Sequence, residues 1–321
     1  MIDNYGREIN YLRISVTDRC NLRCRYCMPA EGCSNLIPRS EILTFEEILR
    51  LTKAAVSIGI HKIRLTGGEP LIRHSVLDLI RRMNEIDGVD EIDITTNGIL
   101  LGDMAEDLKK AGVKRVNISL DTFDPEKYKM ITRGGDLNKA LRGIEAAEKA
   151  GLTPIKINCV ALKGFNDDEF GKFVELTRDR DIHVRFIELM PIGQNDLGGD
   201  FGFISNKEIL AMFPELVSCG HQEFSVADEY KLPGAAGTVG FISALSHEFC
   251  ATCNKIRLTS DGKLKPCLHS NEEIDVKSVL RNGTDEDVKN LLIESIYHKI
   301  PHHLLNDGAA PIHRNMNKIG G

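Results

Sequence analysis

The chain has 321 residues, of which 42% are hydrophobic, enough for one large α/β domain or a barrel with a smaller appendage. The chain has 41 Lys and Arg against 47 Asp and Glu, a net charge of -6. Domains that bind nucleic acids are usually basic, so this charge argues against that function. An acidic protein can still contain a locally basic pocket. The first ten residues lack the apolar core of a signal peptide, and no stretch approaches the roughly 18 apolar residues that span a bilayer. We therefore expect a cytoplasmic protein without a membrane partner, whose nine cysteines indicate metal binding or catalysis instead of disulfides.

Strand and helix patterns alternate over about the first 200 residues. Thr44 with Glu47, Asn166 with Glu169, and Ser205 with Glu208 each have the spacing of a helix-capping box. Six alternating βα units predict a parallel sheet, open or partly closed like a barrel. The predicted strands cover residues 12–16, 62–66, 91–95, 115–120, 154–160 and 184–189.

The pattern changes after about residue 200. Residues 237–244 read as a strand, and residues 255–259 and 263–267 flank a Ser-Asp-Gly turn that predicts a hairpin. A helical stretch at 288–298 precedes a tail that ends in Gly320 and Gly321. We predict a partial barrel over residues 1–200 and a C-terminal α+β extension over residues 201–321.

Turn-forming polar segments follow three of the predicted strands, at residues 67–70, 95–98 and 119–121. Each alone reads as an ordinary turn, since Gly, Asn and Asp favour turns. All three lie at the carboxyl ends of parallel strands, where α/β sheets bind their ligands. Together they predict a binding site at that edge.

Cys20, Cys24 and Cys27 form a first triplet just past the first predicted strand. Three thiols within eight residues can converge on one metal centre if the segment wraps around it. Iron–sulfur clusters take thiolate ligands, usually four for a cubane, so three would leave one iron open for chemistry. A structural zinc site completed by a distant histidine is the alternative.

Cys250, Cys253 and Cys267 form a second triplet that also resembles half of a zinc ribbon, with His247 or His269 available as a fourth ligand. Lys255 and Arg257 follow on alternate positions of a strand and therefore project from one face. Two cations beside an incomplete metal centre indicate a bound anion. The remaining thiols lack such spacing, and we interpret them as buried structural residues: Cys33, Cys159 and Cys219.

The spacing Cys20-x3-Cys24-x2-Cys27, with Tyr26 inside it, resembles the defining motif of radical S-adenosylmethionine (SAM) enzymes. The resemblance implies a [4Fe–4S] cluster whose open iron binds SAM, which is then cleaved to methionine and a 5'-deoxyadenosyl radical. It also implies an incomplete (βα)6 barrel. The SAM contacts that it implies are Tyr26, Gly68 in the Gly-Gly-Glu-Pro turn, Ser119 and Met190.

Most of the chain is similar to one branch of that family, the GTP 3',8-cyclases of molybdenum cofactor biosynthesis. The similar segments are 18–21, 28–32, 43–47, 249–250, 253–259 and 261–267, with the final double glycine. The resemblance implies a second [4Fe–4S] cluster at Cys250, Cys253 and Cys267 that binds the guanine of GTP, and it implies that Arg13, Gly320 and Gly321 reach the reacting groups. The implied GTP contacts are Arg13, Arg64, Thr95, Lys156, Arg185, Lys255 and Arg257.

The residues support this set independently. Lys156 lies between Ile155 and Ile157 and so points to the opposite face from them, and charged groups inside a barrel need an ionic partner. A triphosphate is such a partner, and Arg suits its oxygens. Lys255 stands where many relatives carry Arg, which keeps the charge but loses the planar fork. Neither a GxxxxGK[ST] phosphate loop nor an HExxH motif occurs.

The resemblance predicts a lyase that converts GTP to 3',8-cyclo-7,8-dihydroguanosine triphosphate. A reductant protein, the cyclic pyranopterin monophosphate synthase that follows, and a second copy of the chain are the expected partners. Two alternatives stay open: a radical SAM peptide-maturing enzyme with an auxiliary cluster, and a non-enzymatic zinc or electron-carrier protein. The second explains the cysteines but neither the six βα units nor the turn at 67–70.

Overall fold

The computed structural model describes residues 1–31, 36–193, 197, 199, 201–220, 225–247, 249–303 and 314–320. Its centre is six parallel strands that lie side by side in chain order. These strands match the predicted ones to within two residues at each end. They are β1 (Tyr11–Ser15), β2 (Lys62–Thr66), β3 (Glu91–Thr96), β4 (Val113–Ser119), β5 (Ile155–Ala161) and β6 (Ile182–Glu188).

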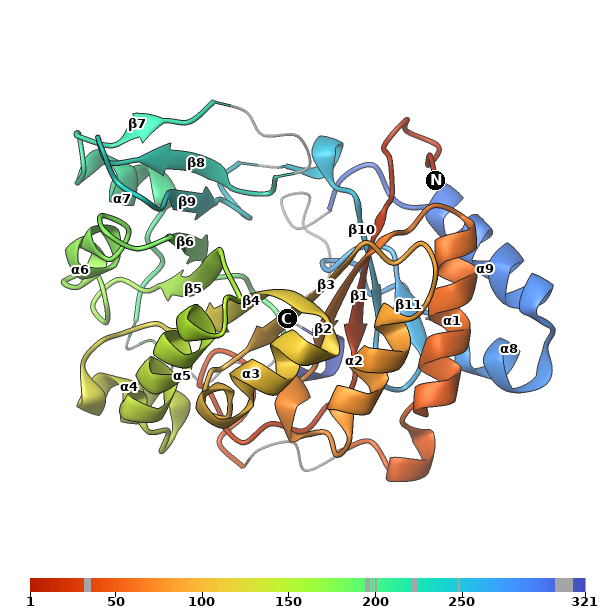
Figure 1. The fold of residues 1–321 in the computed structure, drawn as a ribbon. Helices are drawn as coiled ribbons and strands as arrows, with labels where there is room; N and C mark the ends of the chain where they lie inside the picture. The colour runs from red at the N-terminus through yellow and green to blue at the C-terminus, as the bar shows by residue number, and fades with distance from the viewer. Residues whose placement is uncertain are drawn as a thin grey trace.

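Helices cover the outer face of the curved sheet (Figure 1). In α1, for example, Ile48, Leu51 and Ala55 recur at helical spacing and are fully buried against the sheet. The helices between the central strands are α1 (Phe45–Ser57), α2 (Val76–Asn84), α3 (Leu101–Ala111), α4 (Pro125–Thr132), α5 (Leu137–Lys149) and α6 (Phe170–Glu175).

Alternation along the strands separates the two faces of the sheet. In β5, Ile155, Ile157 and Cys159 are fully buried in the hydrophobic core, whereas Lys156 and Asn158 between them are half-buried and line a cavity. Successive strand residues point to opposite faces, so the polar set faces the inside of the partial barrel. The fold thereby collects charged side chains in its interior.

Strands from beyond residue 200 extend both edges of the central sheet. On one side, β9 pairs with β6 in parallel, and on the other, β10 pairs with β1 in parallel. The added strands are β7 (Val217–Ser218), β8 (Asp228–Lys231), β9 (Val239–Ile242), β10 (Lys255–Leu258), β11 (Lys263–Lys265) and β12 (Ile274–Asp275). The result is one 12-stranded sheet, and the predicted class, an incomplete (βα)6 barrel with a C-terminal α+β extension, is confirmed.

The C-terminal helices pack at one end of the sheet and near its interior. α8 and α9 lie beside α1 at the right of Figure 1, and the C-terminus lies in the middle of the molecule. The helices beyond residue 200 are α7 (Asn206–Ala211), α8 (Lys277–Asn282), α9 (Asp285–Tyr297) and α10 (Met316–Ile319).

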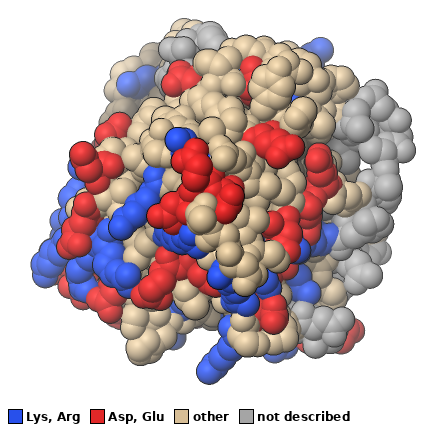
Figure 2. Space-filling view, turned by 90° about the vertical axis from the view of Figure 1, so that its right-hand side faces the viewer, with Lys and Arg blue, Asp and Glu red and all other residues tan. Residues whose placement is uncertain are grey.

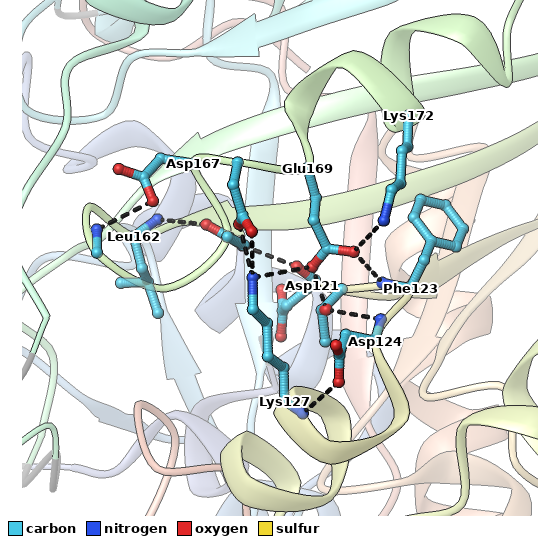
Figure 3. Close-up of polar contacts among 12 residues, drawn as sticks. Asp121, Phe123, Asp124, Lys127, Leu162, Asp167, Glu169 and Lys172 are labelled. Atoms are coloured by element: carbon cyan, nitrogen blue, oxygen red, sulfur yellow. Dashed lines mark hydrogen bonds and ion pairs between the residues drawn. The ribbon is translucent and has the colours of Figure 1, made fainter.

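Two of the three predicted capping boxes form, those of Thr44 with Glu47 and Ser205 with Glu208. The third is wrong, because α6 begins at Phe170, after Glu169. The Glu169 carboxylate instead accepts hydrogen bonds from the Thr122 hydroxyl and from the backbone N–H of Phe123, 3.1 Å away (Figure 3). Hydrogen bonds to residues distant in sequence thus use the Glu169 carboxylate that the predicted capping box required.

Acidic and basic side chains intersperse on the surface that includes α8 and α9 (Figure 2). Arg281 on α8 pairs with Glu47 on α1 at 2.6 Å, and Arg50 on α1 pairs with Asp285 on α9 at 2.6 Å.

Among the helices of the described ranges, none has both the length and the apolar character needed to cross a membrane.

Candidate active site

The first triplet lies in the loop after β1, at the carboxyl edge of the central strands. Cys20, Cys24 and Cys27 line a cavity of about 200 Å³. The backbone N–H groups of Cys27 and Met28 both donate to the carbonyl of Cys24, which turns the chain so that the thiols face one space. Burial, with the neighbouring Cys27 thiol and Asp121, raises the pKa of Cys24 well above its usual value. Iron binding would reverse this shift, because metal ligation favours the thiolate.

The Gly-Gly-Glu-Pro turn after β2 docks directly onto the start of that loop. The Gly68 N–H donates to the carbonyl of Thr17, and the Glu69 N–H donates to the carbonyl of Arg19, each at 2.8 Å. A Cβ atom on Gly68 would lie only 2.2 Å from the Arg19 carbonyl oxygen, so the approach requires glycine. The Glu69 carboxylate in turn accepts from the Asn97 N–H at 2.7 Å, which joins the ends of β2 and β3.

Asp121, at the end of β4, fixes the other side of the loop. Its carboxylate accepts from the Tyr26 hydroxyl at 2.7 Å and from the backbone N–H of Val160 at 2.9 Å. The side chain of Asn166 donates to its carbonyl at 2.8 Å. Burial raises the pKa of Asp121 to about 6. Tyr26, inside the cysteine motif, is thereby tied to β4 and β5.

A larger cavity of about 570 Å³ contains the second triplet and all six predicted cationic contacts. It is lined by Cys250, Cys253 and Cys267, and by Arg13, Arg64, Lys156, Arg185, Lys255 and Arg257. The cations come from β1, β2, β5, β6 and β10, so residues far apart in sequence meet here. The structure therefore brings together the cysteines and cations that the sequence predicted as a group.

Charge in this cavity is strongly unbalanced. Glu229, 3.3 Å from Arg185, is the acidic side chain in the described lining. Asp93, which is not in the lining, pairs with Arg64 at 2.6 Å. Burial, with Arg185 and further arginines, lowers the pKa of Lys156 to about 7. Burial likewise lowers the pKa of Lys255 to about 7, despite the opposing effect of the Cys253 thiol. Such a cavity favours an anionic ligand, because an anion restores the charge that burial suppresses.

The two cavities adjoin. Asn158, Ile187, Met190 and Met316 line both of them, which makes them two chambers of one site. Ser119 and Gly68 line the smaller chamber, as does Thr95, so the structure places Thr95 on the side of the first triplet.

The C-terminal tail reaches this site. The Arg257 guanidinium donates to the carbonyl of Gly320 at 2.9 Å. A Cβ atom on Gly320 would lie 2.5 Å from the Thr66 hydroxyl, so the tail passes close to the end of β2. Gly321 lies outside the described residues, as does Cys33.

The other two thiols differ from each other. Cys159 is fully buried in the core, whereas Cys219 is exposed beside the edge strand β7, so the prediction of a buried role for Cys219 is wrong. A two-residue edge strand offers no neighbouring layer to cover it.

Each triplet offers a metal centre three cysteine thiols as ligands. Within the described ranges, no three His, Cys, Asp or Glu side chains form a group that could hold a single metal ion. A cubane makes a different demand, because each thiolate binds its own iron. The thiols therefore fit an iron–sulfur cluster in number and type.

Sequence reasoning missed the acidic residues that orient these groups. Asp93 is fully buried and stands opposite Arg64 in the register of β2 and β3. A charged residue between Ile92 and Ile94 in a predicted strand was the available signal. Glu229 carries no such signal, because β8 was not predicted.

Comparison with known proteins agrees with this site. The sequence model of the radical SAM superfamily matches residues 14–177, and that of the Molybdenum Cofactor Synthesis C family matches residues 182–305. A GTP 3',8-cyclase of Alkaliphilus oremlandii is 53% identical over all of both chains, and one of Peptoclostridium acidaminophilum is 51% identical over all of this chain and 98% of its own. The crystal structure of Streptococcus suis SuiB bound to S-adenosylmethionine has a TM-score of 0.64, covering 90% of this chain and 67% of that one, and its 14% identity shows the fold alone.

The partial barrel and its cysteine-lined chamber define a radical SAM enzyme, a class that carries a [4Fe–4S] cluster and SAM. Within that class, the chain belongs to the GTP 3',8-cyclase family.

The contact between Gly68 and Arg19 predicts the effect of Gly68→Ala. The added methyl group would displace the carbonyl of Arg19, one residue before Cys20. We expect SAM affinity to fall at least tenfold, about 1.4 kcal/mol, and iron at the first triplet to be lost, as measured by SAM binding and iron content after anaerobic reconstitution. Gly171→Ala is the control, since nothing lies within 4 Å of its added Cβ. Normal SAM affinity in the Gly68 variant would refute the role given to this approach.

Proposed function

We propose that this enzyme uses two electrons from a reductant and one proton to convert GTP and SAM to (8S)-3',8-cyclo-7,8-dihydroguanosine 5'-triphosphate, methionine and 5'-deoxyadenosine. This is the first step of molybdenum cofactor biosynthesis. The observation that carries the proposal is the pair of adjoining chambers, each lined by one cysteine triplet, with an excess of cationic side chains lining the larger. The full-length relatives named for this reaction support it.

In the smaller chamber, Cys20, Cys24 and Cys27 would hold the first cluster. When bound, the cluster and SAM would supply a 5'-deoxyadenosyl radical that takes a hydrogen atom from the ribose C3' of GTP. C3' would then bond to C8 of the base, and the cyclised radical would take up one electron and one proton. The residues proposed to hold SAM in this chamber are Tyr26, Gly68, Ser119 and Met190. Met190 also lines the larger chamber, which favours it as a boundary between SAM and GTP.

In the larger chamber, Cys250, Cys253 and Cys267 would hold a second [4Fe–4S] cluster beside the guanine base. The triphosphate would lie among Arg64, Lys156 and Arg185, and Asp93 keeps Arg64 in place through its 2.6 Å ion pair. Lys255 and Arg257 come from the strand that begins two residues after Cys253, so they are suited to reach the substrate near that triplet. Thr95, on the side of the first triplet, is suited to the ribose.

Arg13 and the tail are proposed to act nearest the reacting carbons. Arg13, the middle residue of β1, lines the chamber and stands in register with Arg257 on β10 and with Arg64 on β2. The bond from Arg257 to Gly320 would carry the tail toward these arginines, with Gly321 beyond it. These groups would exclude water and orient the ribose.

The proposal extends to the organisation of the chain and to its partners. We divide the chain into a radical SAM partial barrel, residues 1–200, and a C-terminal domain of the second cluster, residues 201–321. We also propose that the enzyme is cytoplasmic. The proposed partners are a reductant protein, cyclic pyranopterin monophosphate synthase as the consumer of the product, and a second copy of the chain.

An anaerobic assay with SAM, dithionite and GTP tests the proposal. We expect 5'-deoxyadenosine and a cyclised nucleotide in equal amounts. Cys253→Ser should keep SAM affinity within about twofold but lower cyclisation by at least 100-fold, about 2.7 kcal/mol. Cys219→Ser, on the exposed edge, is the matched control. Full cyclisation by the Cys253 variant, or two zinc ions and no sulfide in the purified protein, would exclude this function.

Lys156 predicts a pH dependence of GTP binding. Its pKa of about 7 leaves it largely neutral in the free protein above pH 7, and the bound triphosphate raises that pKa. Binding then takes up protons, so affinity falls as the pH rises from 7 to 9, by up to about tenfold per unit for each such lysine. Calorimetry in buffers of different ionisation enthalpy measures the uptake. Lys156→Arg should lower it, and an unchanged uptake in that variant would contradict the assignment.

A further inference from the structure

His303 is a buried polar side chain without a hydrogen-bond partner in the described protein. It is 3% exposed, and both of its ring nitrogens are buried and unpaired. Leaving a buried polar group unsatisfied is unfavourable, so such groups are rare unless something else binds them. His303 lines the larger chamber. Its position therefore indicates a ligand contact.

The segment that carries His303 is fixed against the second triplet. Arg7 donates one Nη1 bond to the carbonyl of Cys250 at 3.0 Å and another to the carbonyl of Pro301 at 2.9 Å. The buried ammonium of Lys299 donates to the carbonyl of Pro266, the residue before Cys267. Two cations thus hold residues 299–301 against both halves of the triplet.

The ring of His303 is also oriented by packing. It meets the ring of His269 edge-on, with the centroids 5.0 Å apart, and His269 is two residues past Cys267. The His269 Nε2 atom in turn lies 3.0 Å from the sulfur of Met190, which borders both chambers. His303 therefore lies in the larger chamber beside His269, two residues past Cys267, and the edge-on contact with that ring orients its own.

The chemistry of imidazole selects the part of the substrate that it can serve. A neutral imidazole offers one donor and one acceptor, whereas a triphosphate only accepts. Arg64, Lys156 and Arg185 all line this chamber from the central strands, and the proposed function assigns the phosphates to them. A purine base has donors and acceptors along one edge, which matches a neutral imidazole.

We infer that His303 hydrogen-bonds to the base of the bound nucleotide and positions it at the second triplet. This inference rests on the proposed function. Removing the ring should then weaken binding of the whole nucleotide and leave binding of its phosphate part unchanged.

The test compares GTP with inorganic tripolyphosphate, which lacks base and ribose, on the anaerobically reconstituted enzyme. We expect His303→Ala to raise the Kd for GTP about three- to tenfold, with the Kd for tripolyphosphate within about twofold of the parent. His303→Gln, which keeps a donor and an acceptor, should recover part of the GTP affinity. His298→Ala, at an exposed position five residues earlier, should change neither.

Two outcomes would overturn the inference: an unchanged Kd for GTP in His303→Ala, or equal losses for GTP and tripolyphosphate. The electron paramagnetic resonance signals of both clusters in the variants separate a lost contact from a lost cluster. If His303→Ala loses the second cluster, the His303→Gln variant becomes the test. A Gln variant that keeps both clusters but loses equal affinity for GTP and tripolyphosphate would refute the contact. Failure of the unaltered enzyme to bind GTP would instead reject the proposed function itself.

Discussion

Burial of positive charge inside a curved parallel sheet is the constraint on which the rest of this structure depends. Strand alternation sends the apolar residues of each central strand toward the helices and the cations toward the interior. Asp93 and Glu229 balance part of that charge, through Arg64 and Arg185. The remaining excess makes the interior unfavourable until an anion enters it. The fold is thus electrostatically incomplete without its substrate.

Close backbone contacts fix the conformation of the loop that carries the first triplet. The loop of Cys20, Cys24 and Cys27 has little regular structure of its own, so its shape comes from neighbours. On one side, Gly68 allows the backbone of the loop to approach closely at Arg19. On the other side, the Asp121 carboxylate holds the loop through its hydrogen bond from Tyr26. A thiol-rich segment with little regular structure becomes a defined site because both neighbours lie at the ends of strands.

Much of this architecture could be predicted from local sequence patterns. The predictions that were wrong share one physical cause. The six central strands were predicted because apolar residues alternate or cluster between turn residues. The capping box at Asn166 and the buried role of Cys219 failed, since distant segments decide both. The parallel pairing of β9 and β10 with the barrel edges, and the contacts of Glu229 and His303, likewise join residues that no local pattern connects. Thr95 reads as a substrate contact in sequence, yet its chamber became visible only in three dimensions.

The outermost strands of the described sheet, β7 and β12, are two residues long. Long, flat borders of a sheet invite another polypeptide to continue the ladder, and short ones offer it too few backbone groups. Self-association by strand addition is therefore disfavoured at both rims. Two copies that paired through side-chain surfaces instead would leave the backbone hydrogen bonds of the sheet unchanged.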